Sequence, residues 1–562
     1  MTNSKVIKLL TYLILALQVV TAPNSYGWGA GHDDIAELMV EHLPAEIAEF
    51  FGEEALLKIP KWSHANDNFD DWDKVQKQYF KFTGAEMNLI NEHGITSMYS
   101  FHSTKGQAIC AILLTQAFRD KNKEHSAFWL TTLGHSIADE AACNHGPLLH
   151  YLTYYLQRGY QLPMGEGVGV DFYDAHKTEK GRAIATKLLT KFTPKITATL
   201  PDEFLLQVMR SGIQANAYMT RRESTIAATF DHEATSEIKN KGYIALTELG
   251  VYAVKHCLDA VLTAWSFAQK DTKIVLSTEL LQKHINEETI VKANRPLADD
   301  SIYTDLLEIP AKSQGCYVGF LIEPSISMNK ARFSFLSKPL LSASMRSMKK
   351  AKRPFRALDY REFIDNPLPE PKAMPILVLC AKATPEELKK SIKQYTNRGG
   401  RILWIGKQVV KELGVLSAAM QTMKPAKLPI SPKYGSHGSE KIENIIVTFE
   451  GALSPAMGGK PYRFTQNPNT KAGWMKPYCT VKIGPAKNRV NIIATLTMGS
   501  DTINIAATGL DEQGNRQAVF LPEYLMSPFL FSKIKELPNP SKFKLDEFTE
   551  KLLFATLDLL FE

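Results

Sequence analysis

The stretch that most constrains this chain is residues 134–147, which read Gly-His-Ser-Ile-Ala-Asp-Glu-Ala-Ala-Cys-Asn-His-Gly-Pro. The apolar run just before it, residues 128–133, predicts a buried helix. On that helix His135 and Asp139 lie one turn apart on the same face. His145 lies near the end, where the Gly-Pro pair stops the helix. One rigid element can thus offer three metal ligands, with Asp139 central enough to bridge two ions. The alternative is a core helix whose polar side chains are hydrogen-bonded.

The length and charge of the chain indicate more than one domain. A chain of 562 residues is too long for one hydrophobic core. Residues 301–562 hold 37 Lys and Arg against 23 Asp and Glu, whereas residues 1–300 hold 29 against 36 and thirteen of the fourteen histidines. An acidic, His-rich half can bind several divalent cations. A basic half favours anionic partners such as phospholipid surfaces or nucleic acid, although solvated lysines are the commoner explanation.

The N-terminus has the pattern of a secretory signal peptide over residues 1–27. Two early lysines precede a short apolar run, residues 9–20, and Ser25 and Gly27 provide the small side chains of a cleavage site. The run is too short to span a bilayer comfortably, and no later stretch reaches the length of a transmembrane segment. We therefore expect a secreted or periplasmic protein. Its six cysteines show no CxxC spacing and indicate no disulfide framework.

Cleavage at that site would make Trp28 the new N-terminus. A free α-amino group and His32, four residues later, can both bind one metal ion, although a Trp and a His near a terminus usually mean nothing. Asp33 and Asp34 follow in the first turn of an amphipathic helix, where acidic side chains are favoured.

Further candidate ligands follow along the first half. Residues 61–72 carry several of them, and the sequence leaves open which one binds a metal and whether the segment is only a solvated acidic loop. These candidates are His64, Asp67, Asp70 and Asp71. His102 follows as a lone histidine. His176 and Glu179 are three residues apart, close enough to share a helical face.

The two halves differ in hydrophobic periodicity, which predicts a multidomain fold. Residues 28–295 show helix periodicity and hardly any strand alternation, so we expect an all-α domain. Residues 300–562 contain short apolar runs typical of buried strands, and a helix at residues 384–397 between two of them predicts a β-α-β unit. We expect an open α/β sheet there, with a β-rich insertion at about residues 435–515 and a C-terminal helix.

In this order, the candidate ligands resemble those of the superfamily of zinc-dependent phospholipases C and secreted zinc-dependent single-strand nucleases. The resemblance covers about residues 28–290, roughly half of the chain. Its most specific parts are Trp28 with His32, and the set His135, Asp139 and His145. In that superfamily a bundle of helices binds three zinc ions, so the resemblance implies the same here.

The resemblance assigns ligands to each ion. The first ion would be held by Trp28, through its amino and carbonyl groups, with His32 and Asp139. The second would be held by His102, His135, Asp139 and a carboxylate of residues 64–71, for which Asp67 is the candidate because His64 stands at the family's usual place. The third would be held by His145, His176 and Glu179. The family usually has a carboxylate four residues after the last histidine, where this chain has Lys180.

These assignments imply a zinc-dependent phosphodiester hydrolase. Two zinc ions would bridge a hydroxide that attacks phosphorus in line, and the third would stabilise charge on the phosphate. No Gly-x-Ser-x-Gly elbow or phosphate-binding Gly-Lys-Ser/Thr loop points to another chemistry. Asp139 and Asp67 would carry the catalysis, while the sequence leaves phospholipid and single-stranded nucleic acid as alternative substrates. A second hypothesis is a zinc-containing, non-catalytic protein whose α/β domain binds an anionic ligand.

The second half resembles the class I glutamine-amidotransferase-like fold at its β-α-β unit, residues 376–405. Catalytic members carry a Gly-x-Cys-x-Gly elbow, whereas Cys380 lies in Leu-Cys-Ala-Lys, so we expect it to be a buried structural thiol. The domain would then be accessory. Residues 346–353 form its strongest basic run, which is either a solvated helix face or a phosphate-binding surface.

Overall fold

The computed structural model describes the chain from Gly29 onward, with gaps. The described residues are 29–68, 72–78, 80–150, 152–153, 167–231, 233–270, 272–284, 306, 308–309, 317–322, 337–363, 366–381, 386–406, 420–422, 445–464, 481–483, 487–498, 501–526 and 544–562. The expected signal peptide and Trp28 lie outside them. No helix in these ranges is both long and apolar enough to cross a membrane.

The chain divides into two compact units. The first comprises the chain up to His145, Gly169–Ala215 and Leu246–Asn286; the second comprises Gly146–Val168, Asn216–Ala245 and Glu287–Glu562. The two longest helices, α14 (Pro201–Ala227) and α15 (Ser236–Ala268), contribute to both units.

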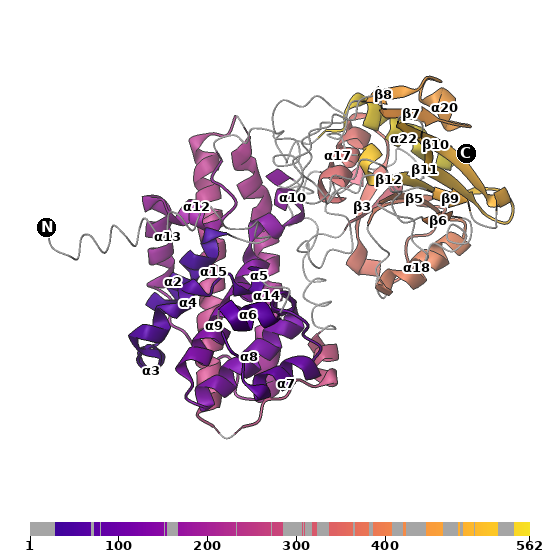
Figure 1. Cartoon of the computed structure of the whole chain (residues 1–562). Coiled ribbons are helices and arrows are strands. Elements are labelled where there is room, and N and C mark those ends of the chain that lie inside the picture. The colour runs from indigo at the N-terminus through magenta and orange to yellow at the C-terminus, as the bar shows by residue number, and fades with distance from the viewer. Residues whose placement is uncertain are drawn as a thin grey trace. The chain divides into compact units, whose positions relative to one another are not determined.

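Every regular element described before residue 306 is a helix, in agreement with the periodicity of the first half (Figure 1). Besides α14 and α15, the longer helices are α2 (Ala30–Glu41), α3 (Ala45–Leu56), α8 (Thr104–Arg119), α9 (Lys123–Ala141) and α13 (Glu179–Leu189). The shorter ones are α4 (Lys58–Lys61), α5 (Ala65–Asn68), α6 (Trp72–Gln78), α7 (Gly84–Glu92), η1 (Met98–His102), η2 (Cys143–His145), α10 (Pro147–His150), α12 (Phe172–His176) and η4 (Ala228–Phe230).

Helix α9 forms the buried centre of the first unit. Asn122 caps it, because its Oδ1 accepts a hydrogen bond from the backbone N–H of His125 at 3.2 Å. Every side chain from Ser126 to Ala141 is buried. The preceding helix, α8, packs against it, and the turn between them passes through Lys121 at φ 53°. The apolar run before residue 134 therefore forms the expected buried helix.

Helix α9 ends earlier than the sequence predicts. Ala142 has extended backbone, and Cys143–His145 forms the separate turn η2. The Gly-Pro pair that was expected to stop α9 instead leads into α10, because proline fits the first position of a helix. His145 therefore lies on a separate turn, and its position is not set by the register of α9.

The turn after His145 is fixed by Glu223 of α14, within the second unit. One carboxylate oxygen of Glu223 accepts hydrogen bonds from the backbone N–H groups of Leu148 and Leu149. The other lies 2.9 Å from the Nζ of Lys338, and both charged side chains are almost fully buried. A Cβ added at Gly146 would overlap the Glu223 carboxylate, so a larger residue there would displace that side chain. Each of these two buried charges compensates the other, and either one alone would be costly to bury.

Strands are described only after residue 306, where ten of them form one mixed sheet in the order β1-β3-β2-β4-β5-β12-β11-β10-β7-β8. Strands β3, β2, β4, β5 and β12 are parallel, and the others pair antiparallel. The first strands are β1 (Glu308–Ile309), β2 (Val318–Ile322), β3 (Phe355–Asp359), β4 (Ile376–Cys380) and β5 (Arg401–Gly406). The later ones are β7 (Ile445–Phe449), β8 (Tyr462–Phe464), β10 (Val490–Met498), β11 (Asp501–Leu510) and β12 (Arg516–Pro522), with β6 (Met420–Thr422) paired to β9 (Val481–Ile483) apart.

The helices described in this region include several that pack against strands of the sheet. The described helices are α17 (Ser337–Lys350), η6 (Tyr360–Phe363), α18 (Glu386–Asn397), α20 (Leu453–Ala456), η7 (Lys487–Arg489), α21 (Glu523–Met526) and α22 (Glu547–Phe561). The expected β-α-β unit is β4-α18-β5, and Gly399 at φ 90° reverses the chain after α18. The expected cap at residue 384 lies outside the described residues. Strands β7, β8, β10 and β11, from the expected insertion, extend the same sheet through β12.

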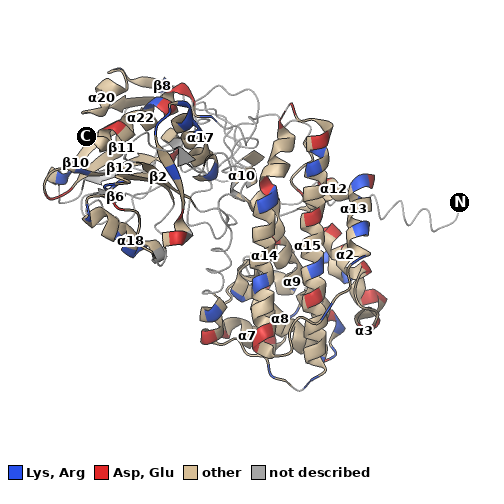
Figure 2. Ribbon diagram, turned by 180° about the vertical axis from the view of Figure 1, so that it is seen from behind, with Lys and Arg blue, Asp and Glu red and all other residues tan. Residues whose placement is uncertain are grey.

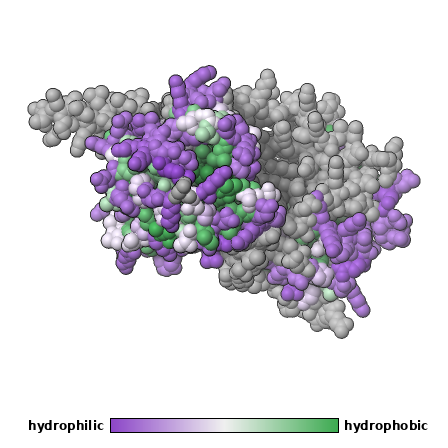
Figure 3. Space-filling model, turned by 90° about the horizontal axis from the view of Figure 1, so that it is seen from below, coloured by the Kyte–Doolittle hydropathy of each residue, from purple (hydrophilic) through white to green (hydrophobic). Residues whose placement is uncertain are grey.

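Basic and acidic residues are interspersed along the helices (Figure 2). The described surface is mostly hydrophilic with apolar areas between, as seen from one end of the molecule (Figure 3). Large apolar side chains are chiefly internal, and the most exposed ones described are Leu57, Leu200 and Ile196. Hydrophobic burial therefore provides the main stabilisation of each unit.

A buried carboxylate joins α7 to α9. Glu86 Oε1 accepts hydrogen bonds from His125 Nδ1 at 2.8 Å and Trp129 Nε1 at 2.7 Å, and Oε2 accepts one from the backbone N–H of Thr83 at 2.7 Å. Burial opposes ionisation, but the hydrogen bonds from His125 and Trp129 outweigh it and lower the pKa of Glu86.

We expect Glu86→Gln to destabilise the protein by about 2 kcal/mol at pH 7, because hydrogen bonds to a charged group are lost. The folded-state pKa of Glu86 lies below its ordinary value of 4.5, so its contribution is complete above that pH and is lost as the pH falls through the folded-state pKa. Chemical unfolding of the variant and wild type at pH 7 and in acid measures this. The exposed Glu92→Gln is the control. A difference that stays constant in acid would contradict the prediction.

Candidate metal centre

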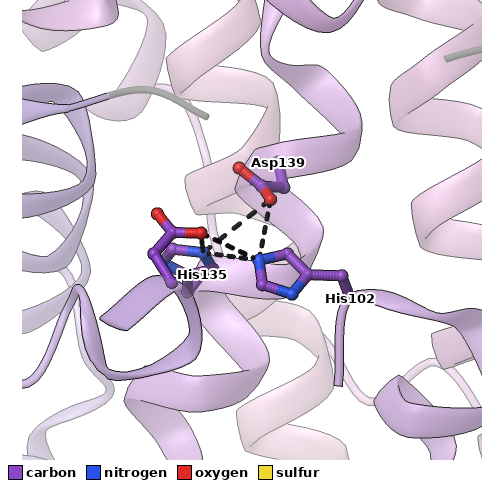
Figure 4. A group of neighbouring side chains, drawn as sticks. His102, His135 and Asp139 are labelled. Atoms are coloured by element: carbon purple, nitrogen blue, oxygen red, sulfur yellow. Dashed lines mark hydrogen bonds and ion pairs between the residues drawn. The ribbon is translucent and has the colours of Figure 1, made fainter. Parts of the chain in front are cut away.

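Four side chains from three elements converge inside the first unit. Asp67 comes from α5, His102 from η1, and His135 and Asp139 from α9. One ligand atom from each lies within 4.8 Å of the other three. Figure 4 shows the ring of His102 pointing towards the carboxylate of Asp139, with His135 beside them. These four residues are the set that the resemblance implies for the second ion.

The closest contacts centre on the Nε2 atom of His102. It lies 3.0 Å from Asp139 Oδ2 and 3.2 Å from Asp67 Oδ1. It also lies 3.1 Å from the Nε2 atom of His135. The His135 atom is in turn 3.6 Å from Asp67 Oδ1 and 3.8 Å from Asp139 Oδ2. The four ligand atoms therefore enclose one small volume.

Neighbouring side chains hold α5 in place beside α9. The amide Nδ2 of Asn66, the residue before Asp67, donates to the backbone oxygen of Thr132 at 3.2 Å and to Ser136 Oγ at 3.0 Å. All three of these side chains are buried. Asp67 is consequently fixed to the same helix that carries the two α9 ligands.

The turn that carries His102 is fixed against α8. Ser103 caps α8 by accepting a hydrogen bond from the backbone N–H of Gly106 at 3.0 Å. A Cβ on Gly106 would overlap backbone atoms of Ser100 and Phe101 in η1. The glycine therefore permits the close approach that places His102 at the cluster.

Backbone carbonyls fix the tautomers of both histidines. His102 Nδ1 lies 2.8 Å from the backbone oxygen of Tyr99, and His135 Nδ1 lies 2.5 Å from that of Ser63. A carbonyl oxygen only accepts hydrogen bonds, so each Nδ1 carries the proton. In the neutral rings both Nε2 atoms then present lone pairs to the cluster. Such a carbonyl contact is also the usual outer partner of a metal-binding histidine.

The cluster is buried, and its ionised carboxylates favour a positive charge beside them. Among the described groups, Asp67 Oδ2 and Asp139 Oδ1 are buried without a hydrogen-bond partner. Burial disfavours ionisation, but the nearby histidines outweigh it and lower the pKa of both carboxyl groups. Burial also opposes protonation of His102, but Asp139 and Asp67 raise its pKa to about 10. The Nε2 lone pairs and the carboxylates that face one another can therefore be stabilised either by a shared proton or by a metal ion between them.

His32 approaches the other side of Asp139. Its Nε2 atom lies 3.2 Å from Asp139 Oδ1, whereas His102 faces Oδ2. The rings of His32 and His135 are stacked with centroids 3.9 Å apart. Burial and the neighbouring His135 lower the pKa of His32 to about 4, so its ring is neutral and available as a ligand near pH 7. Asp139 therefore presents one oxygen to each of two ligand groups.

The two residues after His32 reach further histidines. Asp33 Oδ1 lies 3.1 Å from His64 Nε2 and also accepts a hydrogen bond from Ser63 Oγ. Asp34 Oδ2 lies 3.2 Å from His176 Nδ1. The sequence indicated both aspartates only as first-turn residues of a helix. Their pairing depends on the packing of α2 against α12 and the segment before α5, which no local pattern reveals.

The remaining candidates are placed as follows. His145 is buried and close enough to Asp139 to lower its pKa. His64 is paired with Asp33 and is outside the four-residue cluster. Glu179 is exposed in the first turn of α13. Trp28, Asp70 and Asp71 lie outside the described residues. No second cluster of three or more potential metal ligands is found among the described residues.

The candidates in the α/β region have ordinary structural roles. Cys380 is a buried free thiol at the end of β4, and burial raises its pKa, as expected for an inert side chain. Part of the basic run pairs with α22. Arg353 contacts both oxygens of Asp558 at 2.7 and 3.1 Å, and Lys350 Nζ lies 3.8 Å from Glu550. These contacts use some of the charge that the sequence offers to an anionic partner.

Comparison of the chain with protein-family models, with curated proteins and with solved structures finds no match in any of the three. Arguments about its function therefore depend on its own residues.

We expect the cluster to bind Zn²⁺ and His102→Gln to weaken that binding by more than about 100-fold, because loss of an outer partner alone costs 10- to 100-fold. Isothermal titration of metal-free protein and the zinc-induced rise in melting temperature measure the effect. The matched control is His93→Gln at the end of α7, away from the cluster. Equal affinities in the two variants would exclude His102 as a ligand.

Proposed function

We propose that the chain is a secreted zinc-dependent phosphodiester hydrolase. The observation that supports it most is the convergence of Asp67, His102, His135 and Asp139, with lone pairs facing one buried point. The helical region would be the phospholipase C and nuclease-like bundle that the order of the ligands resembles. The α/β region would be an accessory domain with a glutamine-amidotransferase-like fold.

The donor set fits zinc. Imidazole nitrogens and carboxylate oxygens in a tetrahedral arrangement are common zinc ligands, whereas magnesium and calcium prefer oxygen donors alone. Two histidines and two carboxylates here provide four such donors. The carbonyl contacts of both Nδ1 atoms supply the outer hydrogen bonds that orient metal-binding rings.

The two oxygens of Asp139 support a second ion beside the first. Oδ2 belongs to the four-residue cluster, and Oδ1 faces His32, which the resemblance assigns to an ion shared with Trp28. A third ion would lie near His145 and His176. Asp34 faces His176, whereas Glu179 is exposed. We therefore assign the carboxylate ligand of the third ion to Asp34.

Each residue would have a defined task in hydrolysis. Zinc, when bound, supplies Lewis acidity that activates water and stabilises negative charge on phosphate. Asp139 would fix the spacing of two cations. Asp67 holds one oxygen towards His102, and its Oδ2 atom, which has no donor among the described residues, is free to accept a proton from water. Tyr99 and Ser63 keep the rings of His102 and His135 oriented through their backbone oxygens.

An activity panel tests the proposal. Zinc-loaded protein is assayed against lecithin, single-stranded DNA, single-stranded RNA and a chromogenic phosphodiester, with chelator-treated protein as the control. Chelator-sensitive hydrolysis of any of them supports the proposal, and the preferred substrate decides between lipid and nucleic acid. Bound zinc without hydrolysis of any substrate would favour the non-catalytic binding protein. Absence of bound zinc would contradict both hypotheses.

Asp139→Asn should lose at least one zinc per chain and lower turnover by more than about 100-fold, since it removes the charge that offsets two dications while keeping the volume. Zinc content by mass spectrometry and kcat on the preferred substrate measure the two effects. Glu140→Gln is the matched control, because it removes the adjacent carboxylate of α9, which is not among the cluster's ligands. Unchanged zinc content and kcat in Asp139→Asn would remove α9 from the zinc site.

Asp34→Asn should lose one zinc ion selectively, whereas Glu179→Gln should keep the wild-type number. The reason is that only the Asp34 carboxylate faces His176, at 3.2 Å. Zinc content at increasing chelator concentration distinguishes them, with an expected 10- to 100-fold or greater loss of affinity for that ion, about the size seen for outer-shell partners. Loss of zinc in the Glu179 variant alone would reassign the ligand.

A further inference from the structure

The first turn of α2 has no cap of its own. Its N-cap residue is Gly29, which has no side chain to accept a hydrogen bond. Helices normally satisfy these first backbone N–H groups with a nearby Ser, Thr, Asp or Asn. In this chain the acceptor comes from another helix. The side chain of Asp171 accepts hydrogen bonds from the backbone N–H groups of Gly29 and Gly31.

Asp171 serves two helices at once. It is also the N-cap of α12, where Oδ1 accepts a hydrogen bond from the backbone N–H of Tyr173 at 3.1 Å. One partly buried carboxylate therefore joins the beginnings of α2 and α12. The positive ends of both helix dipoles meet at this charge, which favours its ionised form. Burial acts in the opposite direction and is the larger effect, so it raises the pKa of Asp171 to about 7.

The two helix ends are in close contact. A Cβ added at Gly31 would overlap Oδ1 of Asp171 and would also meet Phe172 at 3.1 Å. Only glycine therefore allows the carboxylate to reach the first turn of α2. The absence of a side chain at Gly31 therefore serves the close approach of Asp171 to α2.

The residue after Gly31 is His32, whose Nε2 atom lies 3.2 Å from Asp139 Oδ1. Its other ring nitrogen, Nδ1, is buried without a hydrogen-bond partner within the described residues. In contrast, His102 and His135 are each oriented by a backbone carbonyl. Apart from its contact with Asp139, the orientation of the His32 ring therefore depends on its backbone and on stacking against His135. The backbone position is set by the hydrogen bonds that Asp171 makes one and three residues earlier.

We propose that Asp171 is a positioning residue for the ion shared by His32 and Asp139. By fixing the backbone of α2 just before His32, Asp171 would orient the ring in place of a hydrogen bond to Nδ1. This inference rests on the proposed zinc centre, but it assigns a role to a residue outside the ligand set. It predicts that loss of Asp171 affects the His32 ion and leaves the ion of the four-residue cluster in place.

Three variants test this on the processed full-length protein. Asp171→Ala removes the carboxylate, and Asp171→Asn keeps one accepting oxygen. Thr178→Ala is the matched control, because Thr178 Oγ1 caps the neighbouring helix α13 by accepting from Gly181 N–H at 3.0 Å, and its described hydrogen bonds lie within α12 and α13. Zinc content is measured at increasing chelator concentration, and hydrogen exchange is measured for the peptide covering residues 29–35.

We expect Asp171→Ala to bind one zinc ion about 10- to 100-fold more weakly, as loss of an orienting partner does, and to exchange faster in residues 29–35. Asp171→Asn should be intermediate in both, and Thr178→Ala should match wild type. Wild-type zinc affinity and exchange in Asp171→Ala would overturn the inference while leaving the proposed function intact. Loss of all zinc in both Asp171 variants would also overturn it, because Asp171 would then be needed for the whole metal centre and not for the His32 ion alone. A wild-type protein that binds no zinc would remove the proposed function itself.

Discussion

The first unit depends on the contacts between the Asp139 carboxylate and the histidine rings around it. The carboxylate is buried on α9, and imidazole rings from α2, η1 and α9 itself surround it. A buried, unpaired carboxylate would cost several kcal/mol, so these rings, a shared proton or a metal ion must compensate it. The requirement ties α2 and η1, which are distant from α9 in sequence, to that helix. The otherwise apolar surroundings of α9 make that compensation stronger than it would be in water.

Much of this arrangement follows from local sequence patterns. The apolar run before residue 134 forms a buried helix, and His135 and Asp139 share its face as their spacing predicts. The order of the remaining ligands led to His102 and Asp67, which do join them. In the second half, continuous apolar runs located β2, β4 and β5 closely, because buried parallel strands are apolar on both faces. These features are encoded within a few residues, so a single sequence suffices.

Other features depend on tertiary packing and escaped prediction. Strand β3, which reads Phe-Arg-Ala-Leu-Asp, has an exposed arginine within it and lacks the apolar run of its neighbours. Helix α17 buries several serines, so its sequence resembles a polar loop more than a core helix. The end of α9 was placed too late, since the Gly-Pro pair that looks like a stop signal begins α10. In each case the deciding contact comes from residues far away in the chain.

The first turn of α2 shows the same limit at the site itself. From the sequence, Asp33 and Asp34 have the ordinary place of acidic residues at a helix start. In the structure, four consecutive residues reach four different partners: Gly31 meets Asp171, His32 meets Asp139, Asp33 meets His64, and Asp34 meets His176. Because these partners come from α9, from α12 with its N-cap and from the segment before α5, the turn can take this form only after the surrounding helices have packed. Formation of the His32 side of the metal centre is therefore coupled to completion of the fold, whereas the pair on α9 exists as soon as that helix forms.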